Sequence, residues 1–158
     1  LQGANVIYVQ EADFDPGYEL DQLTKTRTDI GASVSFVGHM RARNDGRAVE
    51  TMTLEHYPGM AEKALAQIEA EAHARWPLDA SLIIHRVGPL KPGDRIVLVI
   101  TASAHRQAAF EAAEFLMDWL KTKAPFWKKE EGPEGTNWVA SKATDENAAR
   151  RWAASSKP

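Results

Sequence analysis

The chain contains no cysteine among its 158 residues. This absence excludes disulfides, thiolate metal sites, a cysteine nucleophile and a persulfide relay carried by the chain itself. Any sulfur chemistry at this protein would therefore need another molecule to carry the sulfur. The histidines also lack the i,i+4 spacing and the HExxH pattern of metal-binding helices, so we expect no metal site.

Long apolar runs are missing as well. No run approaches the roughly 20 residues that cross a bilayer, and the opening LQGANVIYVQ lacks the basic start and long apolar stretch of a signal peptide. The formal net charge is -3, whereas a general nucleic-acid coat or a binder of anionic membranes usually carries a basic excess. We expect a cytoplasmic protein that binds neither nucleic acid nor membrane, with any basic site confined to one place.

Several familiar catalytic motifs are absent too. The sequence has no GxxxxGK[ST] and no GxGxxG, so a nucleotide P-loop or a dinucleotide site is unsupported. It has no GxSxG, which argues against a serine hydrolase of that type. Carboxylate pairs such as Glu130 with Glu131 do not single out a glycosidase or a protease. We expect no cofactor, and what remains is an electropositive, lysine-containing site.

The composition fits one globular domain. With 44% hydrophobic and 26% charged residues, a chain of this length buries roughly two thirds of its unfolded surface. We assign residues 1–152 to a single domain and residues 153–158 to a frayed tail. Strand-like runs interleaved with two main helices predict an α+β fold with a mostly antiparallel or mixed sheet, which ends in a C-terminal hairpin and a short helix.

Hydrophobic periodicity and turn residues predict the elements along the chain. The expected strands are 5–10, 32–37, 49–55, 81–87 and 96–102, and the expected hairpin is 126–131 with 136–140. One expected helix begins at Pro16 with Asp15 as its N-cap, two others span 58–76 and 106–121, and a short helix capped by Asp145 runs through Trp152. We expect strands 32–37 and 49–55 to pair across the basic loop GHMRARNDGR. The run IVLVI is apolar on both faces, which predicts a central strand.

Helix 106–121 carries the most detailed expectations. Ser103 is a candidate N-cap, and Pro125 should end the helix just after Lys121. Five apolar side chains are predicted to be buried on its core face: Phe110, Ala113, Leu116, Met117 and Leu120.

Positive charge is concentrated in KTKAPFWKKE, where four lysines surround a proline and two large aromatics. Lys121 ends a helix and Lys128 enters a strand, so the two ammonium groups can converge on one pocket. Phe126 and Trp127 would supply apolar walls, and such walls lower a lysine pKa. The plainer interpretation, which the spacing alone favours, is that these lysines offset a helix dipole or are solvated on an exposed hairpin.

Two other places carry clustered cations. His105 and Arg106 follow a strand and open a helix, where free backbone N–H groups add to a possible phosphate or carboxylate site. They can equally contact only water or a surface carboxylate. The loop after residue 37 holds Arg41, Arg43 and Arg47, which form either a second anion clamp or a solvated turn.

Four runs, in order, closely resemble the large, catalytic subunit of molybdopterin synthase: TLEHYPGMAEKAL, RWPLDASLIIHRVGPLKPGD, SAHRQAAFEAAEFLMDWLKTKAPFWKKE and EGTNWV. The resemblance extends over residues 32–152. It implies a sulfurtransferase of molybdenum cofactor biosynthesis that converts cyclic pyranopterin monophosphate into the dithiolene-bearing molybdopterin. It also implies that sulfur arrives as a thiocarboxylate on the C-terminal Gly-Gly tail of a small ubiquitin-like subunit.

Carried over residue by residue, the resemblance implies that Lys121 and Lys128 are catalytic. Six further positions match substrate-binding or pocket-lining residues of the family: Arg41, His105, Arg106, Phe36, Met117 and Lys142. Lys142 stands where the family often has an arginine, and GHMR replaces the more usual GxVR. The family resemblance further implies a homodimer that binds two small subunits at its distant ends as a heterotetramer, and the terminal hairpin is the candidate dimer surface.

Two other functions fit the same residues. One is a non-catalytic partner of a ubiquitin-like tail, in which the lysines only anchor a carboxylate. The other is an RNA-binding module built on Phe126, Trp127 and the lysines, which predicts a steep dependence of affinity on salt. The acidic overall charge counts against the second.

Overall fold

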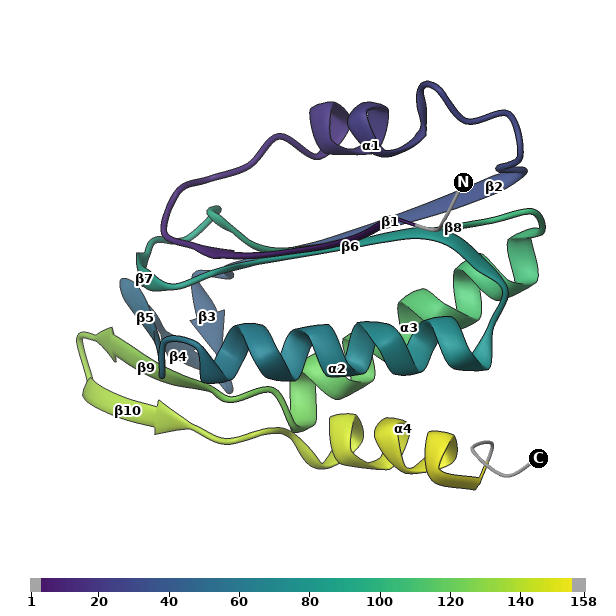
Figure 1. Ribbon diagram of the computed structural model, residues 1–158. Helices are drawn as coiled ribbons and strands as arrows, with labels where there is room; N and C mark the ends of the chain where they lie inside the picture. The colour runs from purple at the N-terminus through teal and green to yellow at the C-terminus, as the bar shows by residue number, and fades with distance from the viewer. Residues whose placement is uncertain (1–3, 155–158) are drawn as a thin grey trace.

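The structure is a computed structural model that describes residues 4–154 (Figure 1). Its elements in chain order are β1 (Ala4–Gln10), α1 (Pro16–Thr24), β2 (Ala32–His39), β3 (Arg43–Asn44), β4 (Arg47–Ala48), β5 (Thr51–His56), α2 (Met60–Arg75), β6 (Leu78–Arg86), β7 (Gly88–Leu90), β8 (Arg95–Ser103), α3 (Arg106–Thr122), β9 (Phe126–Gly132), β10 (Gly135–Val139) and α4 (Ala143–Ala154). Within these residues no helix has the length and apolar character needed to cross a bilayer.

The first sheet has the strand order β1-β6-β8-β2. β1 runs parallel to β6, and the other neighbours are antiparallel. α1 covers one face and α2 and α3 cover the other (Figure 1). Both faces of β8 are therefore buried, with Leu98 and Ile100 in one apolar cluster and Val97 and Val99 in the other. The predicted central position of IVLVI and the α+β class with a mixed sheet are confirmed.

The second sheet has the order β10-β9-β5-β7 and contains the predicted terminal hairpin. The predicted pairing of strands 32–37 and 49–55 is wrong, because β2 pairs with β8 whereas β5 pairs with β7 and β9. β8 is buried on both faces, so its backbone needs a hydrogen-bonded strand along each edge. β6 lies along one edge and β2 along the other. The connecting loop instead pairs with itself as β3 and β4, across the Asp-Gly turn in which Asp45 and Gly46 have φ of 52° and 76°.

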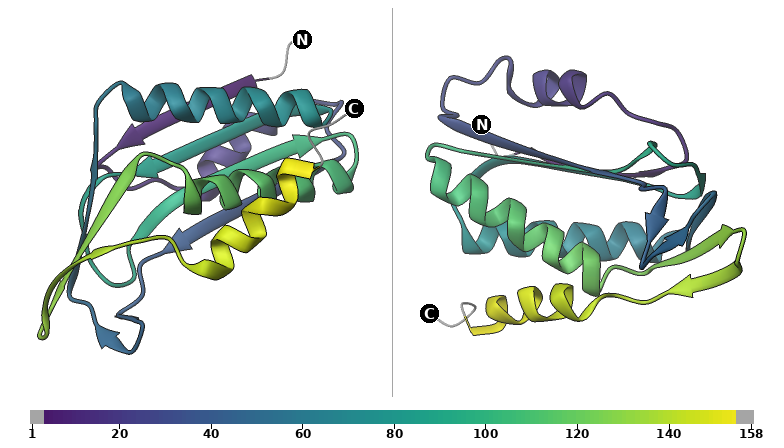
Figure 2. Two further views of the ribbon diagram at one scale, coloured as in Figure 1. Left: turned by 90° about the horizontal axis from the view of Figure 1, so that it is seen from below. Right: turned by 180° about the vertical axis from the view of Figure 1, so that it is seen from behind.

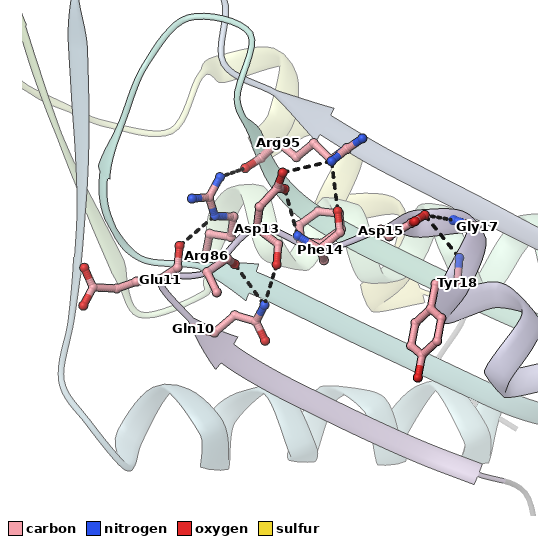
Figure 3. Close-up of polar contacts among 10 residues, drawn as sticks. Gln10, Glu11, Asp13, Phe14, Asp15, Gly17, Tyr18, Arg86 and Arg95 are labelled. Atoms are coloured by element: carbon pink, nitrogen blue, oxygen red, sulfur yellow. Dashed lines mark hydrogen bonds and ion pairs between the residues drawn. The ribbon is translucent and has the colours of Figure 1, made fainter.

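The connection from β1 to α1 is fixed by polar contacts (Figure 3). As the sequence predicts, Asp15 caps α1, where its carboxylate accepts hydrogen bonds from the N–H groups of Gly17 and Tyr18. The Arg95 guanidinium contacts the Asp13 carboxylate at 3.0 Å. The Arg86 guanidinium donates to the carbonyl oxygens of residues 11 and 95. These bonds tie the connection to the ends of β6 and β8.

α3 departs from expectation at two positions. Ser103 does not cap it, because the hydroxyl donates to the Pro77 carbonyl oxygen at 2.8 Å, and His105 occupies the N-cap without a side-chain hydrogen bond. Phe110, predicted to be buried, is 61% exposed. The buried stripe of α3 follows small residues such as Ala109 and Ala112, which lets the helix lie close to the sheet and turns Phe110 outward.

The C-terminal helix starts earlier and ends later than expected. α4 begins at Ala143, so Asp145 lies in its first turn and is not the cap. Residues 153 and 154, predicted to be frayed, continue the helix, and the rest of the predicted tail lies outside the described residues. α4 packs along α3 (Figure 2), where the Asp118 carboxylate accepts hydrogen bonds from Arg151 at 3.0 Å and from the Trp152 indole at 2.6 Å.

A buried polar cluster joins α2 to the first sheet. Glu69 is 2% exposed, and its carboxylate accepts hydrogen bonds from the Ser81 hydroxyl at 2.5 Å and the Val6 N–H at 3.2 Å. The Ser81 oxygen also lies 2.8 Å from Nε2 of His73. Burial raises the pKa of Glu69 from 4.5 to about 7, against the opposing effect of its two donors.

This pKa predicts how stability depends on pH. Between pH 4.5 and about 7 the folded chain binds a proton at Glu69 that the unfolded chain has lost, so stability falls as pH rises through this window. Glu69→Gln should remove that loss, and the free energy of unfolding of the variant relative to wild type should rise by roughly 1–3 kcal/mol from pH 5 to pH 8. Urea unfolding at both pH values measures the change. Glu71→Gln, at an exposed position of α2, is the control, and parallel pH profiles of Glu69→Gln and wild type would contradict the prediction.

Candidate active site

A cavity of about 490 Å³ lies where the two sheets meet α3 and the start of α4. Its wall is built from the end of β2, the β3 strand, β9, the last turn of α3 and residues 139–145. Segments that are far apart in the sequence therefore converge on one space. Five cationic side chains line it: Arg41, Arg43, Lys121, Lys128 and Lys142.

The two predicted catalytic lysines line this cavity together. α3 ends at Thr122, and Pro125 keeps the helix from continuing into β9. Alternate residues of a strand face the same side, so Phe126, Lys128 and Glu130 all reach the cavity. Trp127 faces away and is 48% exposed. The expectation that Phe126 forms a wall is confirmed, and the same expectation for Trp127 is wrong.

Lys128 has an unusual electrostatic environment. Its pKa is lowered from 10.5 to about 8; burial is the largest cause and the Lys121 ammonium acts in the same direction, whereas Asp145 and Glu130 oppose them. At pH 7 a lysine with this pKa is a neutral amine for roughly one tenth of the time. Lys128 can therefore both donate and accept a proton near neutral pH.

Glu130 positions the basic loop beside the cavity. Its two carboxylate oxygens accept hydrogen bonds from the Asn44 amide at 3.0 and 3.2 Å, which fastens β3 to β9. Arg43 is held within the same turn by a hydrogen bond to the Gly46 carbonyl oxygen. In the sequence, Glu130 stands out only as half of a non-specific carboxylate pair with Glu131. Its spacing of two residues from Lys128 on a predicted strand is the signal that places both on one face.

His85 is a further lining residue that the sequence analysis did not assign to the site. It lies on β6, as expected for a strand-face residue, and is 6% exposed. Its ring stacks on Phe126 with centroids 3.9 Å apart and planes 8° apart. The sequence signal is weak, because a histidine at the end of the apolar run SLII also fits an ordinary core position.

The other predicted site residues divide into two groups. Arg41, Met117 and Lys142 line the cavity. His105 and Arg106 are exposed at the opposite end of α3. At 1.5 Å per residue, Arg106 lies about 24 Å along the axis from Thr122, at the helix end that faces the cavity. Within a single chain, three of the six predicted binding positions thus do not line this cavity: Phe36, His105 and Arg106. Within residues 4–154, no three His, Asp or Glu side chains are grouped to hold a metal ion.

The sequence and the fold both match known proteins. A family model described as MoaE protein matches residues 9–123. The molybdopterin synthase catalytic subunit of Pseudomonas aeruginosa is 59% identical over 146 residues, which cover 92% of this chain and 97% of that protein. The one from Ralstonia nicotianae is 57% identical over 92% of this chain and 83% of its own length. The solved structure of a molybdopterin biosynthesis MoaE protein from Burkholderia ambifaria has a TM-score of 0.80 and 49% identity, and the match covers 94% of this chain and 98% of that chain.

The proximity of the two lysines can be measured by titration. In Lys121→Met the neighbouring ammonium is gone, so the pKa of Lys128 should rise from about 8, but it should stay below 10.5 because burial is the larger cause. NMR titration of isotopically labelled lysine side chains reports this value. Lys123→Met, at the C-cap of the same helix and outside the cavity lining, should leave it unchanged. An identical Lys128 titration in wild type and Lys121→Met would show that the two ammonium groups do not interact.

Proposed function

The chain belongs to the family of molybdopterin synthase catalytic subunits, and we propose that it converts cyclic pyranopterin monophosphate to molybdopterin in the cavity lined by Lys121 and Lys128. The convergence of these two lysines with Arg41 in one partly buried space carries this proposal. The substrate has a phosphate, and the reaction develops negative charge on a thiocarboxylate carbonyl and on the pterin side chain. Cations already held in place stabilise such charge better than water does.

The two lysines are suited to different parts of this task. Lys128 is largely buried and has a pKa near 8, so it can transfer protons as a general acid or base. Lys121 is exposed at the cavity rim and can contact an incoming anionic group. With no cysteine in the chain, the sulfur comes from a partner in this proposal. That partner is a small ubiquitin-like subunit with a C-terminal thiocarboxylate.

An extended Gly-Gly tail fits this route to the site. Glycine has no side chain, so such a tail can pass through a narrow opening with its backbone extended. Capture of a terminal carboxylate by cationic and backbone groups is a recurring mode of peptide recognition. A tail that enters the cavity would place its thiocarboxylate between the ammonium groups of Lys121 and Lys128.

A second copy of the chain would bring the distant cations to the cavity. Arg106, Phe110, Met117 and Lys121 follow one another at spacings of four, seven and four residues, so they share one face of α3. β2 beside this helix is an edge strand, and its Phe36 is 39% exposed. A two-fold axis across this face would bury Phe36 and Phe110.

Two antiparallel copies of α3 would then set the start of one helix beside the end of the other. His105 and Arg106 of one chain would meet the cavity of its partner. The outer face of the terminal hairpin, with Trp127 48% and Trp138 59% exposed, is the surface that the sequence alone favoured for the dimer. We favour the α3 and β2 face because it carries both halves of the predicted site. The heterotetramer with two small subunits and the cytoplasmic location stay predictions.

The catalytic role of Lys121 is tested by its removal. Lys121→Ala should lower molybdopterin formation by orders of magnitude while the fold survives, because a lysine at a helix end contributes at most about 1 kcal/mol. The assay uses the purified chain, the thiocarboxylated carrier and cyclic pyranopterin monophosphate. Lys123→Ala is the matched control and should keep wild-type turnover. Near wild-type turnover in Lys121→Ala would remove this residue from the mechanism.

The same assay separates the enzyme from the non-catalytic alternative. A wild-type chain that binds the carrier tightly and forms no molybdopterin is a binding partner only. A carrier that lacks its two terminal glycines should support no sulfur transfer, since its thiocarboxylate would not reach the lysines. Unimpaired transfer from that shortened carrier would defeat the proposed route.

A shared site predicts complementation between two inactive variants. Lys121→Ala and Arg106→Ala should each be impaired alone, the second mainly through weaker substrate binding. In a mixed dimer one site carries both substitutions and the other carries neither. Random re-association should therefore restore about one quarter of wild-type activity. Absence of any recovery, although mixed dimers are seen by native mass spectrometry, would show that the two residues do not serve one site across the dimer.

A further inference from the structure

The His85 ring has one polar atom, Nε2, that makes no hydrogen bond to any residue that the structure describes. Its Nδ1 lies 2.9 Å from the Arg86 carbonyl oxygen. A carbonyl oxygen can only accept, so Nδ1 carries the hydrogen. The Arg86 side chain is itself fixed through Glu11 and Arg95, which holds this stretch of backbone in place.

The ring is neutral in this position. The pKa of His85 is lowered to about 4; burial is the largest cause, the hydrogen bond to the Arg86 carbonyl oxygen opposes it, and the nearby ammonium groups of Lys128 and Lys121 act in the same direction as burial. A neutral imidazole with its hydrogen on Nδ1 has a free lone pair on Nε2. Nε2 is therefore a hydrogen-bond acceptor at any pH well above 4.

This acceptor is open to the cavity. Among the described residues, no buried side-chain nitrogen or oxygen lacks a hydrogen-bond partner. Among residues 4–154, Nε2 of His85 has no hydrogen-bond partner, so this nitrogen is not fully buried and must reach the space that the ring lines. The side chain as a whole is only 6% exposed, and the stack on Phe126 fixes its plane. A rigid, almost fully buried ring thus presents a single lone pair to the cavity.

The surrounding polar groups make this lone pair distinctive. Lysine and arginine side chains only donate hydrogen bonds in their charged forms, and five of them line the same cavity. Two carboxylates also line the cavity: Glu130, whose oxygens both accept from Asn44, and Asp145 at the start of α4. Nε2 of His85 differs from both because it is an uncharged acceptor on a rigid, almost fully buried ring. The cations suit a phosphate or a thiocarboxylate, but they cannot satisfy an N–H or O–H group of a ligand. A buried donor without a partner would cost about 1–3 kcal/mol.

We propose that Nε2 of His85 accepts a hydrogen bond from an N–H or O–H group of the heterocyclic part of the substrate. This inference rests on the proposed function, because it assigns a contact to the ring system whose phosphate the cations bind. A pterin has ring N–H and amino donors, which distinguish it from a simple phosphate ester. His85 is then a residue that selects for the heterocycle, whereas the lysines and arginines select for negative charge.

The test compares two ligands and three variants. His85→Phe keeps an aromatic ring to stack on Phe126 and removes the acceptor, so the Kd for cyclic pyranopterin monophosphate should rise about tenfold or more. Sulfate has no hydrogen to donate, and its affinity should not change. His85→Gln can offer an amide oxygen and should recover part of the lost affinity. His56→Phe, next to Phe126 but outside the cavity lining, should bind both ligands as wild type does.

A direct measurement on the unaltered chain covers the case in which His85→Phe fails to fold. In wild-type protein labelled with ¹⁵N-histidine, the Nε2 signal should be that of an unprotonated nitrogen and should shift when cyclic pyranopterin monophosphate is added, but not when sulfate is added. An unshifted Nε2 signal in the saturated complex, or equal substrate affinity of folded His85→Phe and wild type, would overturn the inference and leave the proposed function intact. A wild-type chain that neither binds nor converts the substrate would overturn both.

Discussion

The stacked contact between Phe126 and His85 joins the two sheets, and the cavity depends on it. Phe126 packs against the apolar cluster under the first sheet and also against the cluster of the second sheet. It is the first residue of β9, so its position sets where that strand starts relative to β6. Lys128 lies two residues further on the same face and is therefore carried inward beside Lys121. Without this contact the hairpin would have no fixed position over the end of α3.

Burial of a lysine at this place is tolerated because the surroundings offset part of its cost. An isolated ammonium in an apolar site loses its hydration, and the usual response is a lower pKa. Asp145 and Glu130 favour the charged form of Lys128, whereas burial and Lys121 oppose it, and the result is a pKa of about 8. A group near this value is useful for proton transfer, while a fully solvated lysine would stay charged. The protein as a whole remains acidic, so the cationic character belongs to the cavity and not to the surface at large.

α4 completes this arrangement from the far end of the chain. Hydrogen bonds from Arg151 and Trp152 to Asp118 hold the helix on α3, and Trp152 packs edge-on against Trp76 and Phe115. The start of the same helix delivers Asp145 to the cavity, and Lys142 precedes it. The electrostatics of Lys128 therefore depend on a docking contact about two turns away, at the other end of α4.

The sequence by itself determined the features that rest on short-range geometry. Pro125 ends α3, Asp15 caps α1 and the Asp45-Gly46 pair makes a tight turn, because each of these follows from the backbone preferences of a few adjacent residues. The alternation along a strand, together with the proline break, showed that Lys121 and Lys128 can converge on one pocket, but the spacing alone favoured solvated lysines, and only the packed structure places both in the cavity.

Only the tertiary structure decided which distant segments meet. Strand patterns specify a buried face but not a partner, so β2 could not be assigned to β8 from its sequence. Helix periodicity likewise predicts an apolar stripe but not how far that stripe extends around the helix. Close packing of α3 through its alanines left Phe110 exposed. The roles inferred for His85 and Glu130 depend on contacts with Phe126 and Asn44, which lie 41 and 86 residues away in the chain. No local rule reaches across such separations, because the contacts exist only after both sheets have packed together.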